Sequence, residues 1–174
     1  MKEVRWHARA GQGAKTVSQL LAEAGLLAGS SVQAFPEYGP ERRGAPMRAY
    51  TRISEKTIRR HDPVAAPDIV IVLEPTLVNE MNVAEGLADE GIVLVDSNEM
   101  PERLKGVNAR AIPALKIAHE HGLKFSNVVM LGAAAAAGGI PLANIQDAAV
   151  KKLGKRLDAD SLRGAIAEGY ACLA

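Results

Sequence analysis

Two segments of this 174-residue chain carry groups that can bind an anion or a partner surface. The first is 35–46, where three prolines and two glycines surround the adjacent Arg42 and Arg43. Proline fixes φ and glycine permits angles that other residues avoid, so this composition predicts a rigid loop of defined shape. Each guanidinium group can bind a carboxylate or a phosphate through two parallel hydrogen bonds. The alternative is a solvated pair, or a local ion pair with Glu37 or Glu41.

The second segment is a glycine-rich turn formed by Gly11, Gln12 and Gly13. Backbone amides at a turn that opens a helix can hold a phosphate or a carboxylate. The spacing is not a dinucleotide fingerprint, because the third glycine would fall at Thr16. It is not a phosphate-binding Walker loop either, because Lys15 is one residue too far from the glycine. A tight turn that serves packing alone remains the alternative.

Other polar side chains are weaker candidates for chemistry. His119 and His121 are two residues apart on a predicted helix, so they point to different sides, which argues against a shared metal ion. His7 could reach the glycine turn or be a structural residue. Residues 96–98 (Asp-Ser-Asn) close a predicted central strand, where they either contact a ligand or cap a helix. Cys172 lies in the C-terminal tail without a histidine partner in sequence.

The elements that must position these groups follow from hydrophobic periodicity. Residues 3–8 alternate between apolar and polar side chains, as a strand does, and apolar residues after Ala14 recur at helical spacing. The predicted strands are 3–8, 32–35, 47–53, 69–73, 92–95 and 109–112. The predicted helices are 14–29, 74–87, 113–121, 128–137, 144–154 and 159–170. The small residues of 133–139 predict close helix packing.

This alternation predicts the α/β fold class. We expect a single domain with a mostly parallel sheet, flanked by helices on both faces. One strand near 47–53 is predicted to be antiparallel or at the edge, and half-exposed. At 48% hydrophobic residues, the chain can bury one sizeable core. It has no apolar run long enough to span a membrane and begins without a secretory signal, so a cytoplasmic protein is expected.

Cysteine count and charge narrow the function classes. One cysteine excludes a disulfide framework, an intrachain iron–sulfur cluster and a four-cysteine zinc site. The net charge of +1 argues against broad nucleic-acid binding. Residues 1–60 hold eleven Lys/Arg and five Asp/Glu, a net +6, and residues 61–174 hold ten and fifteen, a net −5. The positive half suits an anionic ligand or an acidic neighbour, or it is one end of a dipolar surface.

No set of nucleophile, base and orienting residue emerges, and no paired carboxylates, so neither a catalytic residue nor a metal ligand is predicted. This points to one component of a larger assembly. With those residues in view, the whole chain, 1–174, resembles the gamma subunit of the 2-oxoacid:ferredoxin oxidoreductases, of the pyruvate synthase type. The resemblance is carried by 7–19, around the glycine turn, and by 33–46. The chain has Ala8 and Ala10 where the family usually has glycine.

The resemblance implies a division of labour. In the family, thiamine diphosphate with Mg and the iron–sulfur clusters are held by other subunits, so this chain is expected to hold no cofactor alone. The complex converts a 2-oxoacid and coenzyme A to acyl-CoA and CO2, and ferredoxin receives the electrons. The sequence favours pyruvate or a branched-chain oxoacid. The alternatives are a 2-oxoglutarate or indolepyruvate oxidoreductase subunit, or a stand-alone module that binds a nucleotide or acyl-CoA.

The resemblance also implies two groups of site residues. Those expected to face coenzyme A are Gly11, Gln12, Gly13, Arg42 and Arg43. Those expected to face partner subunits are Glu37, Tyr38, Gly39, Pro40, Glu41 and Gly44. The expected partners are the alpha, beta and ferredoxin-like delta subunits, with ferredoxin reached through the complex. No nucleic acid or membrane is expected as a partner, and the isolated chain is expected to be able to form a homodimer.

Overall fold

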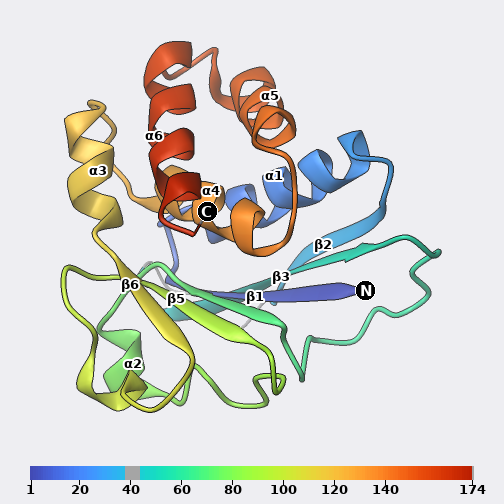
Figure 1. Cartoon of the computed structure of the whole chain (residues 1–174), viewed down its shortest axis with the longest axis vertical. Coiled ribbons are helices and arrows are strands. Elements are labelled where there is room, and N and C mark those ends of the chain that lie inside the picture. The colour runs from blue at the N-terminus through green and yellow to red at the C-terminus, as the bar shows by residue number, and fades with distance from the viewer. Residues whose placement is uncertain (38–43, 174) are drawn as a thin grey trace.

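The computed structural model describes residues 1–37 and 44–173, and within them the chain forms a single α/β domain with one six-stranded sheet (Figure 1). The strands are β1 (Lys2–Arg9), β2 (Ser31–Glu37), β3 (Pro46–Ser54), β4 (Ile69–Val72), β5 (Ile92–Asp96) and β6 (Ala109–Ile112). The helices are α1 (Ala14–Leu27), α2 (Leu77–Glu80), α3 (Ala114–Glu120), α4 (Asn127–Ala137), α5 (Leu142–Leu153) and α6 (Ala159–Ala171), with a 3-10 turn η1 (Glu102–Leu104). The predicted fold class is confirmed.

The strand order is β2-β3-β1-β4-β5-β6. The pairs β1–β4, β4–β5 and β5–β6 are parallel, and β3 is antiparallel to both of its neighbours. The antiparallel strand predicted near 47–53 is therefore confirmed. Its predicted half-exposure is wrong, because Tyr50, Thr51 and Arg52 are at most 1% exposed. β2 covers its outer edge, α1 packs on one face, and on the other the carbonyl of Asp62 accepts a hydrogen bond from Arg52.

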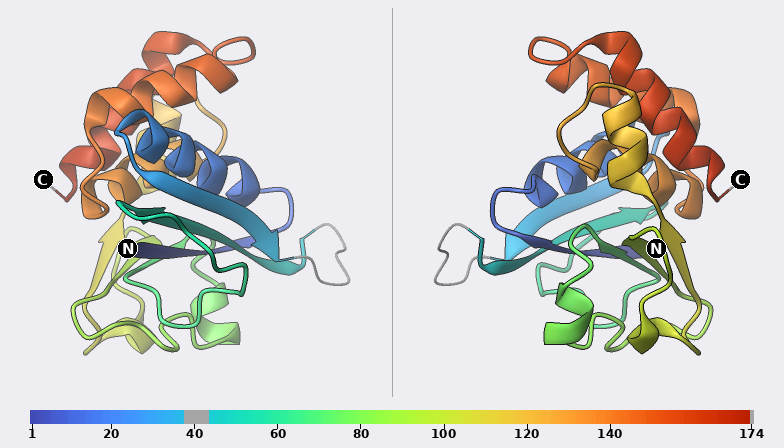
Figure 2. Two further views of the ribbon diagram at one scale, coloured as in Figure 1. Left: turned by 90° about the vertical axis from the view of Figure 1, so that its right-hand side faces the viewer. Right: turned by 90° about the vertical axis from the view of Figure 1, so that its left-hand side faces the viewer.

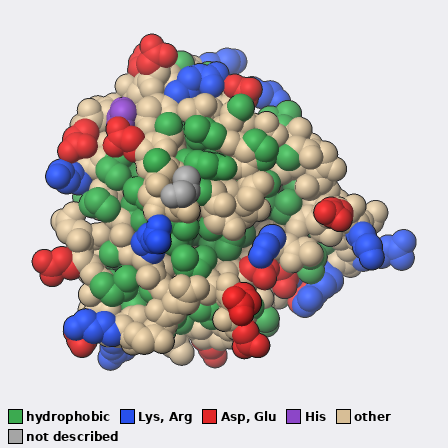
Figure 3. All heavy atoms as spheres, viewed as in Figure 1, with side chains coloured by type: hydrophobic (Ala, Val, Ile, Leu, Met, Phe, Trp, Pro, Cys, Tyr) green, Lys and Arg blue, Asp and Glu red, His purple; other side chains and the backbone are tan. Residues whose placement is uncertain are grey.

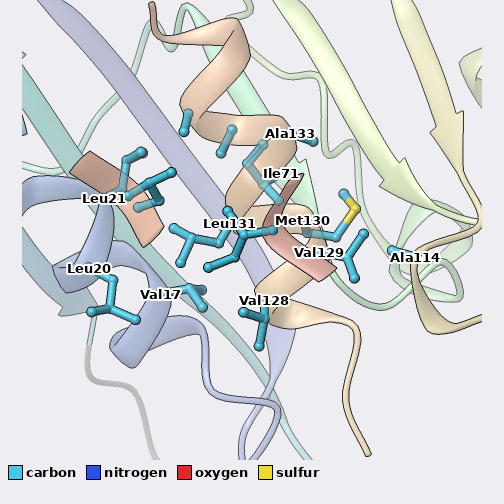
Figure 4. Packing of buried hydrophobic residues seen from close by; sticks show 14 of the residues in the cluster. Val17, Leu20, Leu21, Ile71, Ala114, Val128, Val129, Met130, Leu131 and Ala133 are labelled. Atoms are coloured by element: carbon cyan, nitrogen blue, oxygen red, sulfur yellow. The ribbon is translucent and has the colours of Figure 1, made fainter. Parts of the chain in front are cut away.

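The larger core lies between the sheet and the helices α1, α4, α5 and α6 (Figure 1). Figure 4 shows the side chains of α1 meeting those of α4 above Ile71 of β4. Val17 and Leu20 of α1, and Val129 and Leu131 of α4, are fully buried. Val17 and Leu20, three residues apart, lie on one face of α1. Val129 and Leu131, two residues apart, point to different sides of α4, and both are buried because α4 is covered on several sides, from Val128 to Ala135. The sequence predicted these helices to within two residues at each end.

α4 and α6 pack together closely, and their closest approach is at Gly132 and Gly169, outside the 133–139 segment for which the sequence predicted close packing. A Cβ atom at Gly132 would overlap the backbone carbonyl of Ile166, and one at Gly169 would overlap the carbonyl of Val129. The two backbones therefore approach more closely than side chains would allow. One position that requires glycine lies on each helix. The sequence indicated close packing only for the alanine-rich helix, α4.

The opposite face of the sheet carries little helix. The helix predicted over 74–87 is wrong, because only the single turn α2 forms there. Nη2 of the buried Arg5 donates to the carbonyl oxygens of Val83, at 3.0 Å, and Glu85, at 2.5 Å. Because these two carbonyls bind the arginine side chain and not the amides of a helix, the backbone around them is irregular. Gly86 then turns it with φ +69, a left-handed angle that favours glycine.

The chain leaves two neighbouring strands toward opposite faces. After β1 it enters α1 on the helix-covered face, and after β4 it enters α2 on the other face (Figure 2). β1 and β4 are parallel neighbours, so their carboxyl ends lie side by side. In open α/β sheets, a crevice forms where the connections diverge in this way, and ligands bind there. The fold therefore places the glycine turn beside such a crevice.

Candidate functional site

The glycine turn joins β1 to α1 with two left-handed residues. Gly11 has φ +104 and Gly13 has φ +84, angles that favour glycine. Gly13 is also the N-cap residue of α1, and a Cβ atom there would lie 2.5 Å from Nδ2 of Asn127, the first residue of α4. The N-termini of α1 and α4 thus meet at the turn. Both contribute partial positive charge at this place.

The turn is bonded to the end of the 35–46 segment. The Ala10 amide donates to the Ala45 carbonyl at 2.9 Å, and the Gly44 amide donates to the Ala10 carbonyl at 3.2 Å. Nη1 of Arg9 donates to the Gly44 carbonyl at 3.4 Å. The structure therefore brings the two segments singled out in the sequence together. The predicted site residues Tyr38, Gly39, Pro40, Glu41, Arg42 and Arg43 lie outside the described residues.

Glu37 ends β2 and is fixed by a side chain of β3. Its carboxylate accepts a hydrogen bond from the Tyr50 hydroxyl, and it pairs in register with Arg48. Burial, together with the hydrogen bond to Glu37, raises the pKa of Tyr50 to about 12. The rings of Tyr50 and Phe35 pack with centroids 5.2 Å apart. A neutral, packed tyrosine thus anchors the end of β2.

The other side of the turn is bonded to the segment after β4. Nε2 of Gln12 donates to a carboxylate oxygen of Glu74 at 3.0 Å, while Oε1 of Gln12 accepts from the Arg9 amide at 2.7 Å. Nη2 of Arg9 donates to the Thr76 hydroxyl at 2.9 Å and forms an ion pair with Glu80. Burial acts to raise the pKa of Glu74, but hydrogen bonds from Thr76 and Gln12 outweigh it and lower that pKa.

A cleft of about 1110 Å³ opens beside these residues, which we call the switch-point cleft. Its walls come from the turn, the segments after β4 and β5, helix α3 and the link between α3 and α4. It is lined by Gln12, Leu73, Glu74, Pro75, Asp96, Ser97, Asn98, Leu115, Lys116, His119, Glu120, Lys124, Phe125 and Ser126. A cleft of this volume can hold a ligand of nucleotide size. Its position matches the crevice that the divergent connections predict.

Asp96 supports one wall of the cleft. Its carboxylate accepts a hydrogen bond from the Leu115 amide at 3.1 Å, in the first turn of α3, and another from the Ser126 hydroxyl. Burial raises the pKa of Asp96, against these hydrogen bonds. Of the two sequence interpretations for 96–98, Asp96 fits the helix-capping one. Ser97 and Asn98 line the cleft.

The far end of the cleft carries apolar and basic side chains that sequence reasoning did not select. Leu115 and Phe125 are each 46% exposed, and Nζ of Lys124 lies 5.3 Å from the centre of the Phe125 ring. Lys116 and His119 lie on the same wall. In the sequence, the one indication of this group of residues was Phe125, an apolar residue in the short link between two predicted helices. Its role in the cleft can be recognised only in the structure, where that link forms part of the cleft wall.

The histidines have separate surroundings. His119 lines the cleft, whereas Nε2 of His121 lies 2.7 Å from Glu168 of α6. His7 is 1% exposed, accepts from Nε of Arg5 at 3.1 Å, and has no partner for Nδ1 among the described residues. Burial and the nearby Arg5 and Arg48 lower the pKa of His7 to about 3. It is a buried neutral side chain on the face of the sheet opposite to the long helices.

Comparisons with known proteins agree on one family. The family model for pyruvate ferredoxin/flavodoxin oxidoreductase matches residues 3–172. Pyruvate synthase subunit PorC of Thermotoga maritima is 44% identical, over 97% of this chain and 92% of its own length. The pyruvate/ketoisovalerate oxidoreductases common subunit gamma of Pyrococcus furiosus is 46% identical over 80% of each chain.

Solved structures have the same fold. The crystal structure of the PORC subunit from Thermotoga maritima superposes with a TM-score of 0.81 at 41% identity, covering 98% of this chain and 95% of that one. A 2-oxoglutarate:ferredoxin oxidoreductase from Magnetococcus marinus, at 20% identity and a TM-score of 0.82, shows likeness of fold alone over 31% of that chain. With its sequence matched nearly from end to end, the chain belongs to the pyruvate ferredoxin/flavodoxin oxidoreductase family.

Proposed function

We propose that this chain, over 1–174, is the gamma-type subunit of a multi-subunit 2-oxoacid:ferredoxin oxidoreductase. The assembled enzyme would convert a 2-oxoacid and coenzyme A to acyl-CoA and CO2, passing two electrons to ferredoxin. Pyruvate or a branched-chain oxoacid is the proposed substrate, in line with the names of the relatives. The observation that carries this proposal is the match over nearly the full length of subunits so named, at 44% identity.

The cofactors of the reaction are proposed to lie in the partner subunits. Thiamine diphosphate with Mg would activate the oxoacid, and iron–sulfur clusters would carry the electrons. Clusters of this kind need several cysteine thiolates, and Cys172 is the single cysteine of the chain. Among residues 1–37 and 44–173, no three metal-binding side chains gather into a site for an ion. The chain itself would contribute binding and orientation.

Coenzyme A is the ligand proposed for the edge that carries the glycine turn. The N-termini of α1 and α4 meet there, and backbone amides at such a place favour phosphate groups. Arg42 and Arg43 are proposed to meet a coenzyme A phosphate or a partner carboxylate. Glu41 would hold a backbone amide of its own loop or the neighbouring arginine. These three roles rest on the sequence and the family resemblance.

The partner surface is proposed to include the end of β2 and the loop that follows, from Glu37 to Gly44. The alpha, beta and ferredoxin-like delta subunits are the proposed partners. Leu26 and Leu27, at the end of α1, are 60% and 55% exposed. Figure 3 shows hydrophobic side chains across the centre of the face that carries the end of α6. Both observations fit a protein that covers part of its surface in a complex.

A cytoplasmic location is proposed along with this function. Within the described part of the chain, no helix combines the length and the apolar character that crossing a membrane requires.

Purification from the native host, with a tag on this chain, tests the subunit assignment. Co-elution with larger, brown, iron-containing chains is the expected result, and neighbouring genes for thiamine-binding and ferredoxin-like chains would support it. A monomer that binds a nucleotide tightly without partners would instead support the stand-alone binding module.

The reconstituted complex tests the two arginines. Arg42→Ala and Arg43→Ala should lower acyl-CoA formation or weaken assembly by about tenfold, the scale expected for one lost charged hydrogen bond at a binding site. Arg156→Ala is the matched control, because Arg156 is exposed and lies in the link between α5 and α6, away from the turn. Wild-type assembly and activity in both arginine variants would contradict their proposed roles.

A further inference from the structure

Both ends of the Gln12 side-chain amide are bonded inside the protein. Its oxygen accepts from the backbone amide of Arg9, and its nitrogen donates to the Glu74 carboxylate. The first bond closes the turn on itself, and the second attaches the turn to the wall of the switch-point cleft formed by the segment after β4. Two of the four hydrogen bonds that a glutamine amide can make are thus committed to the protein, and they fix the orientation of this side chain.

Glu74 is held just as specifically. One oxygen accepts from Gln12, and the other accepts from the hydroxyl of Thr76 at 2.8 Å and from the backbone amide of Thr76 at 3.3 Å. Thr76 in turn accepts from the Arg9 guanidinium. The Gln12–Glu74 bridge is therefore one link in a network that runs from the turn through Glu74 and Thr76 to Arg9, the last residue of β1. On the other flank of the turn, Gly44 and Ala45 add two backbone hydrogen bonds.

We propose that Gln12 is a positioning residue: its side chain holds the turn against the cleft wall, and so sets where the backbone of the turn meets the ligand. This inference rests on the proposed function, since coenzyme A is taken as the ligand of the turn. Gly11 and Gly13 at positive φ let the backbone adopt this shape, but they do not fix where the turn lies relative to the cleft. The bridge to Glu74 does so.

The bridge requires one amide and one carboxylate. A carboxylate at position 12 would place two negative oxygens at about hydrogen-bond distance, and like charges that close do not both ionise freely. The pair would then share a proton at low pH and repel at high pH. Exchanging the two residues, with Gln12→Glu and Glu74→Gln together, restores the hydrogen bonds. The carboxylate at position 12 accepts from the Arg9 amide and from the side-chain amide at position 74, and the amide oxygen at position 74 accepts from Thr76. The exchanged pair can make the same four hydrogen bonds.

Three variants of the reconstituted complex test this: Gln12→Glu, Glu74→Gln, and the double exchange. In Gln12→Glu, the KM for coenzyme A should rise about tenfold at pH 8, with kcat at saturating coenzyme A within about twofold, because the ligand contacts are displaced but not removed. The rise should shrink as the pH is lowered, because the carboxylate pair then takes up a proton. The double exchange should return KM to within about threefold of wild type.

The control and a second readout separate positioning from general destabilisation. Gln146→Glu makes the same chemical change where Nε2 donates to the Arg163 carbonyl, between α5 and α6, and should leave the KM for coenzyme A unchanged. In the full chain without partners, amide hydrogen exchange should be followed at Arg9 and Ala10, whose amides donate to Oε1 of Gln12 and to the Ala45 carbonyl. Exchange there should be faster in Gln12→Glu and return to the wild-type rate in the double exchange.

An unchanged KM in Gln12→Glu, or a double exchange as defective as the single variant, would overturn the inference. If the wild-type complex forms no acyl-CoA from any 2-oxoacid, the proposed function fails, and the amide exchange rates then decide the bridge alone. Rates that are unaffected by Gln12→Glu would overturn it. Amide exchange rates that rise in Gln12→Glu and return to the wild-type value in the double variant would support the positioning role of Gln12, whichever ligand the turn binds.

Discussion

On the face of the sheet opposite to the long helices, individual polar side chains bind the irregular segments that cover the sheet. The guanidinium of Arg5 donates to the carbonyls of Val83 and Glu85 and to His7. Arg52 is completely buried and pairs with Glu3 at 2.7 Å. Such groups are costly to bury unless every donor finds an acceptor. The paths of the irregular segments on this face are therefore set by the hydrogen bonds of two arginines, Arg5 on β1 and Arg52 on β3.

The burial of His7 predicts how stability depends on pH. Its folded-state pKa of about 3 lies below the ordinary value of 6.5, so the neutral form stabilises the fold. This contribution is complete above pH 6.5 and is lost as pH falls from 6.5 toward about 3. The loss should be on the order of 1 kcal/mol per pH unit. His7→Gln, which still offers Arg5 an acceptor, should flatten the slope in urea unfolding between pH 7.5 and 5.

The control for this prediction is His61→Gln, at an exposed histidine whose Nδ1 lies 2.8 Å from Nε2 of Gln33. It should keep the wild-type slope. Equal slopes for His7→Gln and the wild type would show that His7 does not set the pH dependence.

At the scale of elements, the contact between α4 and α6 determines how closely the helices cover the sheet. Gly132 and Gly169 face each other's helix backbones, where a methyl group would overlap a carbonyl. Rigid, close-packed backbones cannot yield to an added atom as a flexible side chain can. The separation of α4 and α6 therefore depends on these two positions more than on the alanines of 133–139.

Gly132→Ala should destabilise the protein by about 2–3 kcal/mol, because alanine's better helix propensity does not offset the overlap with the Ile166 carbonyl. Gly25→Ala is the matched control in α1, where the new methyl group would meet only side chains, the nearest being Val32 at 3.2 Å. Its effect should stay within about 1 kcal/mol. Chemical denaturation of both variants measures the difference, and equal effects would contradict the close-packing argument.

At the scale of the whole molecule, the larger core draws on both ends of the chain. Trp6 of β1, Leu21 of α1 and Ile166 of α6 belong to one buried cluster. A core that joins the first strand to the last helix makes cooperative unfolding of the whole chain the expected behaviour. The chain is thus built as one rigid unit that can dock onto other subunits.

The isolated chain should therefore fold in a single transition but should not oxidise pyruvate. Electron transfer through clusters needs more thiolates than one cysteine provides. A dye-reduction assay with pyruvate and coenzyme A should detect turnover in the reconstituted complex and none in the chain alone. Turnover by the purified single chain would contradict the proposed subunit role, and its mass in solution would show whether it forms the predicted homodimer.

The amino-acid sequence by itself determined the class of fold and most of its elements. Alternating or continuous apolar residues specified β1, β4 and β5, and helical spacing specified α1, because local periodicity decides which face of an element can be buried. Sequence also singled out the glycine turn and the 35–46 segment, whose proline and glycine content has a direct backbone meaning. These are properties of neighbouring residues.

Only the tertiary structure decided the remainder, because it depends on residues distant in sequence. The failure of the helix at 74–87 follows from Arg5, some eighty residues away, which binds carbonyls in that segment. The place of Phe125 in the switch-point cleft, and the bridge from Gln12 to Glu74, require strands brought side by side. Periodicity describes how one element meets a core, whereas a site is made by the ends of several elements meeting one another.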